Sequence, residues 1–136
     1  MREYNNELGD WISNYSINQY NENYKLCVDL TYKYPYKNEY GCRRRLKELK
    51  GYFNNNGYEI DGVYVSEFDK NWNLHNHILM WFNCDEDMGK SLINKNWKSI
   101  GSSMIRKYEM NLGYETYITK HLNKTLNNNW DFMINL

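Results

Sequence analysis

The sequence predicts an α+β domain in which helices pack against a central antiparallel sheet. The first observation behind this prediction is the order of the expected elements: strand, helix, hairpin, helix, strand, helix. The second is the length of 136 residues, which is enough for one hydrophobic core and too short for two. We therefore expect a single domain over residues 1–136, with residues 1–23 as a peripheral N-terminal segment.

Residues 24–32 form the first expected strand, because large apolar side chains alternate with small or polar ones. One face of this strand should enter the core, and the other is polar enough to border a functional site. Asp29 lies on the polar face, where it could reach a metal ion or, equally well, make a structural hydrogen bond. Pro35 then ends the strand, since proline has no amide hydrogen to give to a sheet.

A helix is predicted over residues 38–53, and an asparagine-rich turn with a glycine ends it. Its expected buried stripe consists of Cys42, Leu46, Leu49 and Phe53. The opposite side carries Arg43 and Arg44. This basic side is either an ordinary solvated face or a surface that contacts the phosphates of DNA.

A hairpin is expected next, with a strand over residues 62–68 that turns back through a short polar loop. The returning strand begins with His75 and His77, whose side chains share one face because residues i and i+2 of a strand do so. A hairpin of this length brings Glu67 next to His75. Trp72 in the loop is either an exposed hydrophobic residue or a platform on which an unpaired base stacks.

Two imidazoles and one carboxylate on neighbouring strands can hold one divalent ion. The set Glu67, His75 and His77 leaves open positions on an octahedral ion such as Mg²⁺ or Mn²⁺, where water or a phosphate oxygen can bind. The simpler interpretation is a pair of histidines on a half-exposed sheet face without any ion.

The C-terminal half is expected to hold a helix that ends near residue 94, a strand over residues 102–107 and a last helix that contains a tyrosine and two lysines. In that last helix Tyr117, Lys120 and Lys124 share one side, which suits a hydroxyl that attacks a phosphate. The letters GKS at 89–91 imitate the end of a nucleotide-binding loop, but the required leading glycine is absent, so we expect neither ATP binding nor a helicase domain.

At this point the chain resembles the HUH endonucleases, and among them the rolling-circle replication initiator (Rep) proteins of viruses and plasmids. The three motifs that carry the resemblance occur in Rep order: residues 26–31 ending in threonine, His75-x-His77, and Tyr117-x-x-Lys120. Relaxases of the same superfamily place the tyrosine before the histidines. Single-tyrosine transposases share the histidine pair but usually lack a lysine three residues after the tyrosine.

The resemblance implies an HUH fold, with about five strands in a ferredoxin- or RRM-like sheet and flanking helices. It further implies that Tyr117 nicks single-stranded origin DNA, forming a 5′-phosphotyrosine link and a free 3′-hydroxyl, and can rejoin the strands. Lys120 would support the developing charge, Lys124 would contact DNA, and Glu67, His75 and His77 would bind Mn²⁺ or Mg²⁺. Tyr114 is more readily explained as a core or neighbouring residue than as a second nucleophile.

Two other functions are compatible with the same residues. A transposase would use the same site but require paired element ends, and a non-catalytic module would bind single strands by stacking without any metal. For the Rep function we expect an origin hairpin as the DNA partner, a host helicase or host replication proteins acting in trans, and a monomer or dimer.

Charge and cysteine content bear on partners and compartment. The 17 basic residues balance the 17 acidic ones, but residues 88–124 carry seven bases against two acids, as a DNA-facing surface would. Three cysteines without paired spacing fit a reducing compartment, so we expect a cytoplasmic protein. No apolar stretch approaches the roughly 20 residues that span a bilayer, so no membrane partner is expected.

Overall fold

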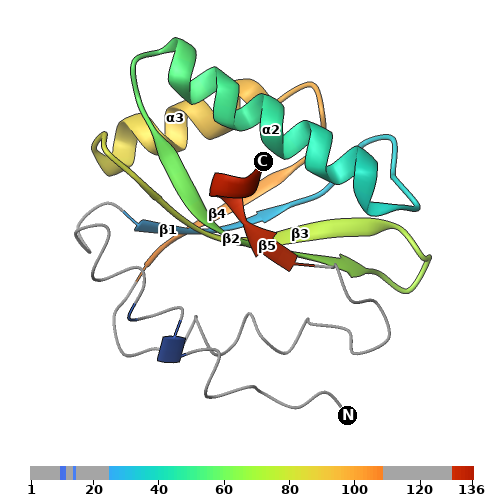
Figure 1. Ribbon diagram of the computed structural model, residues 1–136. Coiled ribbons are helices and arrows are strands. Elements are labelled where there is room, and N and C mark those ends of the chain that lie inside the picture. Colours follow the sequence, from blue (N-terminus) through green and yellow to red (C-terminus); the bar gives the residue numbers. More distant parts are fainter. Residues whose placement is uncertain (1–9, 12–13, 15–24, 109–129) are drawn as a thin grey trace.

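The computed structural model describes residues 10–11, 14, 25–108 and 130–136. In these ranges the chain forms a sheet with helices on one of its faces (Figure 1). The elements are β1 (Lys25–Leu30), α2 (Glu39–Asn55), β2 (Ile60–Phe68), β3 (Leu74–Phe82), α3 (Glu86–Trp97), β4 (Ser103–Lys107), β5 (Trp130–Phe132) and the 3-10 helix η2 (Met133–Asn135).

The sheet has the strand order β4-β1-β3-β2-β5, and every neighbouring pair is antiparallel. From β1 to β4 the chain runs strand, helix, strand, strand, helix, strand, which with this spatial order is the ferredoxin-like arrangement. The predicted α+β class and antiparallel sheet are therefore confirmed. The short strand β5, which pairs with β2 at the sheet edge, was not predicted, because three residues are too few to produce a recognisable alternation.

The main core lies between the sheet and the two helices, and it follows the predicted patterns. The even-numbered residues of β1 face α2 and α3, as do Ile78, Met80 and Phe82 of β3. The predicted α2 stripe of Cys42, Leu46, Leu49 and Phe53 is fully buried against them. A second, smaller cluster covers the other face of the sheet and consists of Cys27, Val63, Val65, Leu79, Trp81 and Tyr108. The sheet is therefore apolar on both faces at its centre, and polar side chains gather toward one end.

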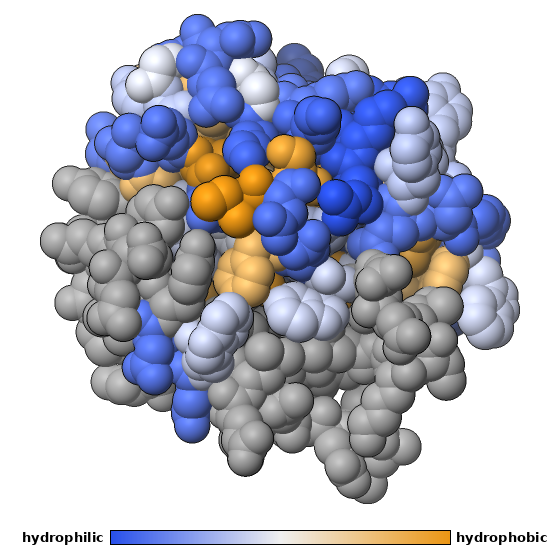
Figure 2. Space-filling view, viewed as in Figure 1, coloured by the Kyte–Doolittle hydropathy of each residue, from blue (hydrophilic) through white to orange (hydrophobic). Residues whose placement is uncertain are grey.

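Helix α2 begins and ends close to the predicted bounds. The side chain of Asn38 accepts a hydrogen bond from the backbone N–H of Tyr40, which caps the helix. At its other end Gly57 adopts a positive φ of 85°, a conformation that glycine reaches without steric cost. The surface over the helix layer is mainly hydrophilic, with a smaller hydrophobic patch near the centre of the view (Figure 2).

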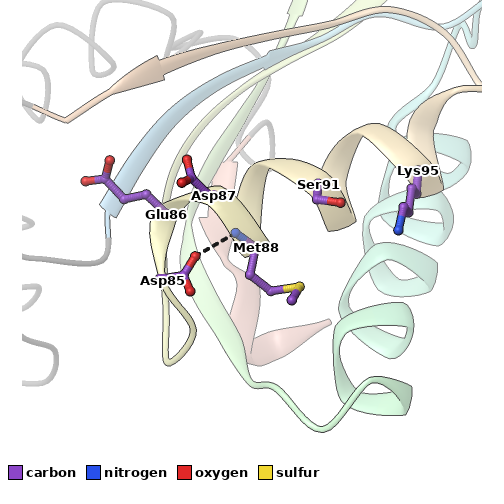
Figure 3. A pocket seen from close by; sticks show the side chains of 6 residues that line it. All are labelled: Asp85, Glu86, Asp87, Met88, Ser91 and Lys95. Atoms are coloured by element: carbon purple, nitrogen blue, oxygen red, sulfur yellow. Dashed lines mark hydrogen bonds between the residues drawn. The ribbon is translucent and has the colours of Figure 1, made fainter.

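Helix α3 begins after Asp85, whose carboxylate accepts a hydrogen bond from the backbone N–H of Met88 at 2.8 Å (Figure 3). The helix continues three residues beyond the expected end at 94, because Trp97 is completely buried and packs against the core. Residues 89–91 lie inside this helix and not in a loop that precedes one, so they have no phosphate-binding conformation. None of the described helices is long and apolar enough to cross a bilayer.

Candidate metal centre

The hairpin of β2 and β3 brings Glu67 and His75 together as a directly paired set of residues. His77 follows two residues later on the same strand and therefore on the same face. That face is the one that α2 and α3 leave uncovered (Figure 1), because the neighbouring even-numbered residues of β3 pack under the helices. The predicted juxtaposition of these three residues is confirmed.

The three side chains offer ligand atoms that all lie within 4.8 Å of one another. His75 Nε2 is 3.4 Å from Glu67 Oε1, and the two imidazole rings are 4.9 Å apart with an interplanar angle of 86°. Ligands bound to one ion at about 2.1 Å are at most about 4.2 Å apart, so small side-chain rotations suffice to close the set around an ion. The residues therefore fit a divalent cation.

Partial burial makes this set more effective as a binding site. The side chains of Glu67, His75 and His77 are 16%, 24% and 14% exposed. Their remaining exposure leaves a route for a ligand, while burial lowers the local dielectric constant and strengthens the interaction with a cation. Among the described residues this is the one group of three or more acids, histidines or cysteines with such spacing.

Asp29 on β1 lies beside His77, to which it is register-paired across the sheet. Its Oδ1 atom is 2.7 Å from His77 Nδ1, and its Oδ2 atom accepts a hydrogen bond from Arg106 Nη2 at 3.2 Å. Burial alone would raise the pKa of the Asp29 carboxyl, but the hydrogen bond to His77 and the charges of His77 and Arg106 outweigh it and lower the pKa below its usual value. Of the two roles considered for Asp29, the structure has the hydrogen bond.

The face of β3 behind the histidines holds a buried polar network that the sequence did not reveal. Asn76, completely buried, donates to Ser66 Oγ at 2.8 Å and to the carbonyl of Val65 at 3.3 Å. It also accepts a hydrogen bond from the hydroxyl of Tyr32. Ser66 in turn donates to Glu39 at 2.8 Å, which ties the start of α2 to the hairpin. The available signal was a lone asparagine at an inward position of an apolar strand.

The predicted DNA contacts on α2 lie in the helix layer, on the opposite side of the sheet from the metal centre (Figure 1). Arg43 donates to Tyr64 Oη at 2.8 Å and pairs with Asp131 at 3.4 Å, so its guanidinium binds other parts of the chain. Arg44 is exposed and donates to Tyr36 Oη at 3.4 Å.

Trp72 lies at the tip of the β2-β3 hairpin with 71% of its surface exposed. Its φ of 61° is rare for a bulky residue, and hydrogen bonds around the tip hold this conformation. The Trp72 N–H donates to the Asp69 carbonyl at 3.0 Å, and Lys37 Nζ donates to the Trp72 carbonyl at 3.2 Å. The indole is 5.8 Å from the ring of Phe68. The tip therefore presents a large aromatic ring on an ordered turn.

The C-terminal residues of the predicted site are outside the described part of the chain. They are Tyr114, Tyr117, Lys120 and Lys124. Their predicted roles stay predictions.

A surface depression next to the start of α3 differs chemically from the metal centre. It is lined by Asp85, Glu86, Asp87, Met88, Ser91 and Lys95 (Figure 3). Met88, which the apolar spacing placed in the core, is 38% exposed here. Three carboxylates at a helix N-terminus stabilise the helix dipole, and they would repel a phosphate backbone.

Comparison with known proteins agrees with the motifs. A family of replication-associated proteins, the ORF2 family, matches residues 25–126, which include the first strand, the hairpin with both histidines and Tyr117. No curated protein and no solved structure matches the chain. The family match extends over three quarters of the sequence and bears out the resemblance to Rep proteins, so the chain belongs to this family of replication-associated proteins.

Proposed function

We propose that this replication-associated protein initiates replication by nicking single-stranded origin DNA, with Tyr117 as the nucleophile. The observation that carries the proposal is the cluster of Glu67, His75 and His77 on one face of the sheet. A carboxylate and two imidazoles at that spacing form a donor set for a hard or borderline divalent ion, Mn²⁺ or Mg²⁺. Membership of a replication-associated family makes DNA the expected substrate.

In the proposed reaction the Tyr117 hydroxyl attacks a backbone phosphorus atom. A bond forms between the tyrosine oxygen and phosphorus, and the bond from phosphorus to the 3′-oxygen breaks. The phenolic proton is lost and the departing 3′-oxygen takes up a proton, which leaves a 5′-phosphotyrosine link and a free 3′-hydroxyl. The 3′-hydroxyl can prime synthesis, and its attack on the link rejoins the strand.

The residues around the phosphate would lower the barrier by binding and orienting it. A phenol with a pKa of about 10 is a poor nucleophile at neutral pH, so it needs a nearby positive charge. Lys120, one helical turn after Tyr117, supplies a charge of this kind if the predicted helix forms. A divalent ion held by Glu67, His75 and His77 would polarise the phosphate and stabilise the added negative charge.

The strand of DNA also needs contacts outside the reacting phosphate. Trp72 is suited to stack an unpaired base, because its indole is exposed and its backbone is held in place. Arg44 and Lys124 are candidates for phosphate contacts. Arg43 is the weakest candidate, since Asp131 and Tyr64 already engage its guanidinium.

A covalent-adduct assay tests the proposal directly. The wild-type chain is incubated with a labelled single-stranded oligonucleotide of its origin hairpin, with Mn²⁺, Mg²⁺ or EDTA, and run on a denaturing gel. We expect a protein-DNA band only with metal, absent in Tyr117→Phe and present in the matched control Tyr114→Phe. Full activity of Tyr117→Phe would overturn the choice of nucleophile.

The same assay separates the alternatives. DNA binding without metal and without any adduct would favour a non-catalytic binding module. Cleavage that requires two element ends would favour a transposase. A helicase or other host replication proteins would have to open duplex DNA in trans, which a single-stranded substrate makes unnecessary in the test.

A further inference from the structure

The carboxylate of Asp29 connects two neighbouring strands at the metal centre. Its Oδ1 atom lies 2.7 Å from Nδ1 of His77 on β3, and its Oδ2 atom lies 3.2 Å from Nη2 of Arg106 on β4. The Asp29 side chain is 26% exposed and the His77 side chain 14%, so the contact between them is largely shielded from water. Each carboxylate oxygen is thus engaged by a different strand, and the carboxylate has a defined orientation.

This contact determines where the proton of a neutral His77 ring lies. An ionised carboxylate can only accept hydrogen bonds, so the nitrogen that faces Asp29 must carry the proton. The neutral ring then has its hydrogen on Nδ1 and its lone pair on Nε2. A metal ion needs that lone pair, and a histidine ligand whose other nitrogen donates to a carboxylate is oriented and made more basic by it.

We propose that Asp29 is a positioning residue, which fixes His77 as the Nδ1–H tautomer and so presents Nε2 as the metal ligand. The inference rests on the metal-binding part of the proposed function. Asp29 itself is not a ligand here, because both of its oxygens are directed to other groups. His75 differs from His77, since its nearest carboxylate is Glu67, a member of the ligand set, at 3.4 Å from Nε2.

The first test is the tautomer of His77 in metal-free protein. Long-range ¹H–¹⁵N NMR distinguishes a protonated from a bare ring nitrogen, and the chain has three histidines, so a His77→Gln variant assigns the signals. We expect a protonated Nδ1 and a bare Nε2 in the wild type. In Asp29→Ala the ring should lose this preference and populate the other tautomer. A purely structural role for Asp29 would leave the tautomer unchanged.

The second test is the affinity for Mn²⁺ alone, measured by isothermal titration calorimetry without DNA. Asp29→Ala should weaken binding by about 10- to 100-fold, as is typical when the carboxylate behind a histidine ligand is lost. Asp29→Asn, which keeps the size of the side chain and an acceptor oxygen, should lie between the two. It serves as the variant of choice if Asp29→Ala does not fold.

Arg106→Gln is the matched control, because it removes the other partner of Asp29 and leaves the contact with His77 intact. The Arg106 side chain is 54% exposed, so its loss should change Mn²⁺ affinity by no more than about fivefold. The tautomer of His77 should stay that of the wild type.

A wild-type His77 that carries its proton on Nε2, or Asp29 variants that bind Mn²⁺ as tightly as the wild type, would overturn the inference. Neither measurement uses DNA or cleavage. If the tautomer and the affinity change as expected while no covalent adduct forms with any oligonucleotide, the nicking proposal fails and the role of Asp29 stands.

Discussion

Asn76 donates a hydrogen bond of 2.8 Å to Ser66 on the helix side of the sheet, while the histidines on either side of it face the opposite way. Because side chains alternate along a strand, anchoring Asn76 inward also keeps His75 and His77 outward. A shift of β3 by one residue would bury both imidazoles and expose the asparagine. The buried polar network therefore specifies the register on which the metal centre depends.

We predict that Asn76→Ala lowers the free energy of unfolding by about 2–3 kcal/mol, because Tyr32 and Ser66 lose a buried partner. Urea denaturation followed by circular dichroism measures this change. Asn54→Ala, at an exposed position in α2, is the control and should change stability by less than about 0.5 kcal/mol. Equal stability of the two variants would mean that the network contributes little.

Glu67→Gln should weaken Mn²⁺ binding about tenfold or more, since a neutral amide replaces the anionic ligand of a hard cation. The amide has nearly the same shape as the carboxylate, so the hairpin should remain folded. Calorimetric titration with Mn²⁺ gives the affinity. Glu48→Gln removes a carboxylate from the exposed side of α2 and should leave the affinity unchanged. Equal losses in both variants would point to a general charge effect.

Trp72→Ala should weaken binding of a single-stranded oligonucleotide by about 1–3 kcal/mol, the contribution of one stacked base. Trp72→Phe keeps an aromatic ring at the hairpin tip and should retain most of the affinity. Fluorescence anisotropy with a labelled oligonucleotide in EDTA measures binding without cleavage. Wild-type affinity of the alanine variant would exclude the tip from the DNA contact.

Two glycines predict opposite effects of the same substitution. A Cβ atom on Gly62 would lie 2.3 Å from the Leu79 carbonyl oxygen in the middle of the sheet, so Gly62→Ala should destabilise the fold by about 2–3 kcal/mol or more. A Cβ atom on Gly51 meets nothing within 4 Å and lies inside α2, so Gly51→Ala should stabilise the fold by up to about 1 kcal/mol. Thermal unfolding of both variants would refute this prediction if their signs agreed.

Glu39 makes stability depend on pH. Its burial raises the pKa of the carboxyl above the ordinary value of 4.5, and the hydrogen bond from Ser66 only partly opposes this. The folded state therefore holds the proton more tightly than the unfolded state, so this residue destabilises the fold as pH rises above 4.5.

Glu39→Gln removes this effect and can still accept the hydrogen bond from Ser66. The variant should gain stability relative to the wild type as pH rises from about 4 to 7, measured by urea denaturation at each pH. Glu59→Gln, on an exposed residue before β2, controls for the loss of one charge. A difference that does not grow with pH would contradict the prediction.

Much of the candidate site was predictable from the sequence because it is local. Alternation along a strand places His75 and His77 on one face, and the length of the hairpin loop pairs Glu67 with His75. The apolar stripe of α2 and the bounds of the long strands follow from the same short-range periodicities. Each of these features depends on residues less than about 20 positions apart.

Only the tertiary structure decided which distant residues meet. Asp29 and His77 are 48 residues apart, and whether that carboxylate bound an ion or an imidazole depended on the register between β1 and β3. Arg43 could not be separated from a solvated or DNA-binding residue until the C-terminal strand placed Asp131 beside it. Local periodicity states which face a side chain occupies, but strand order and packing determine what lies opposite that face.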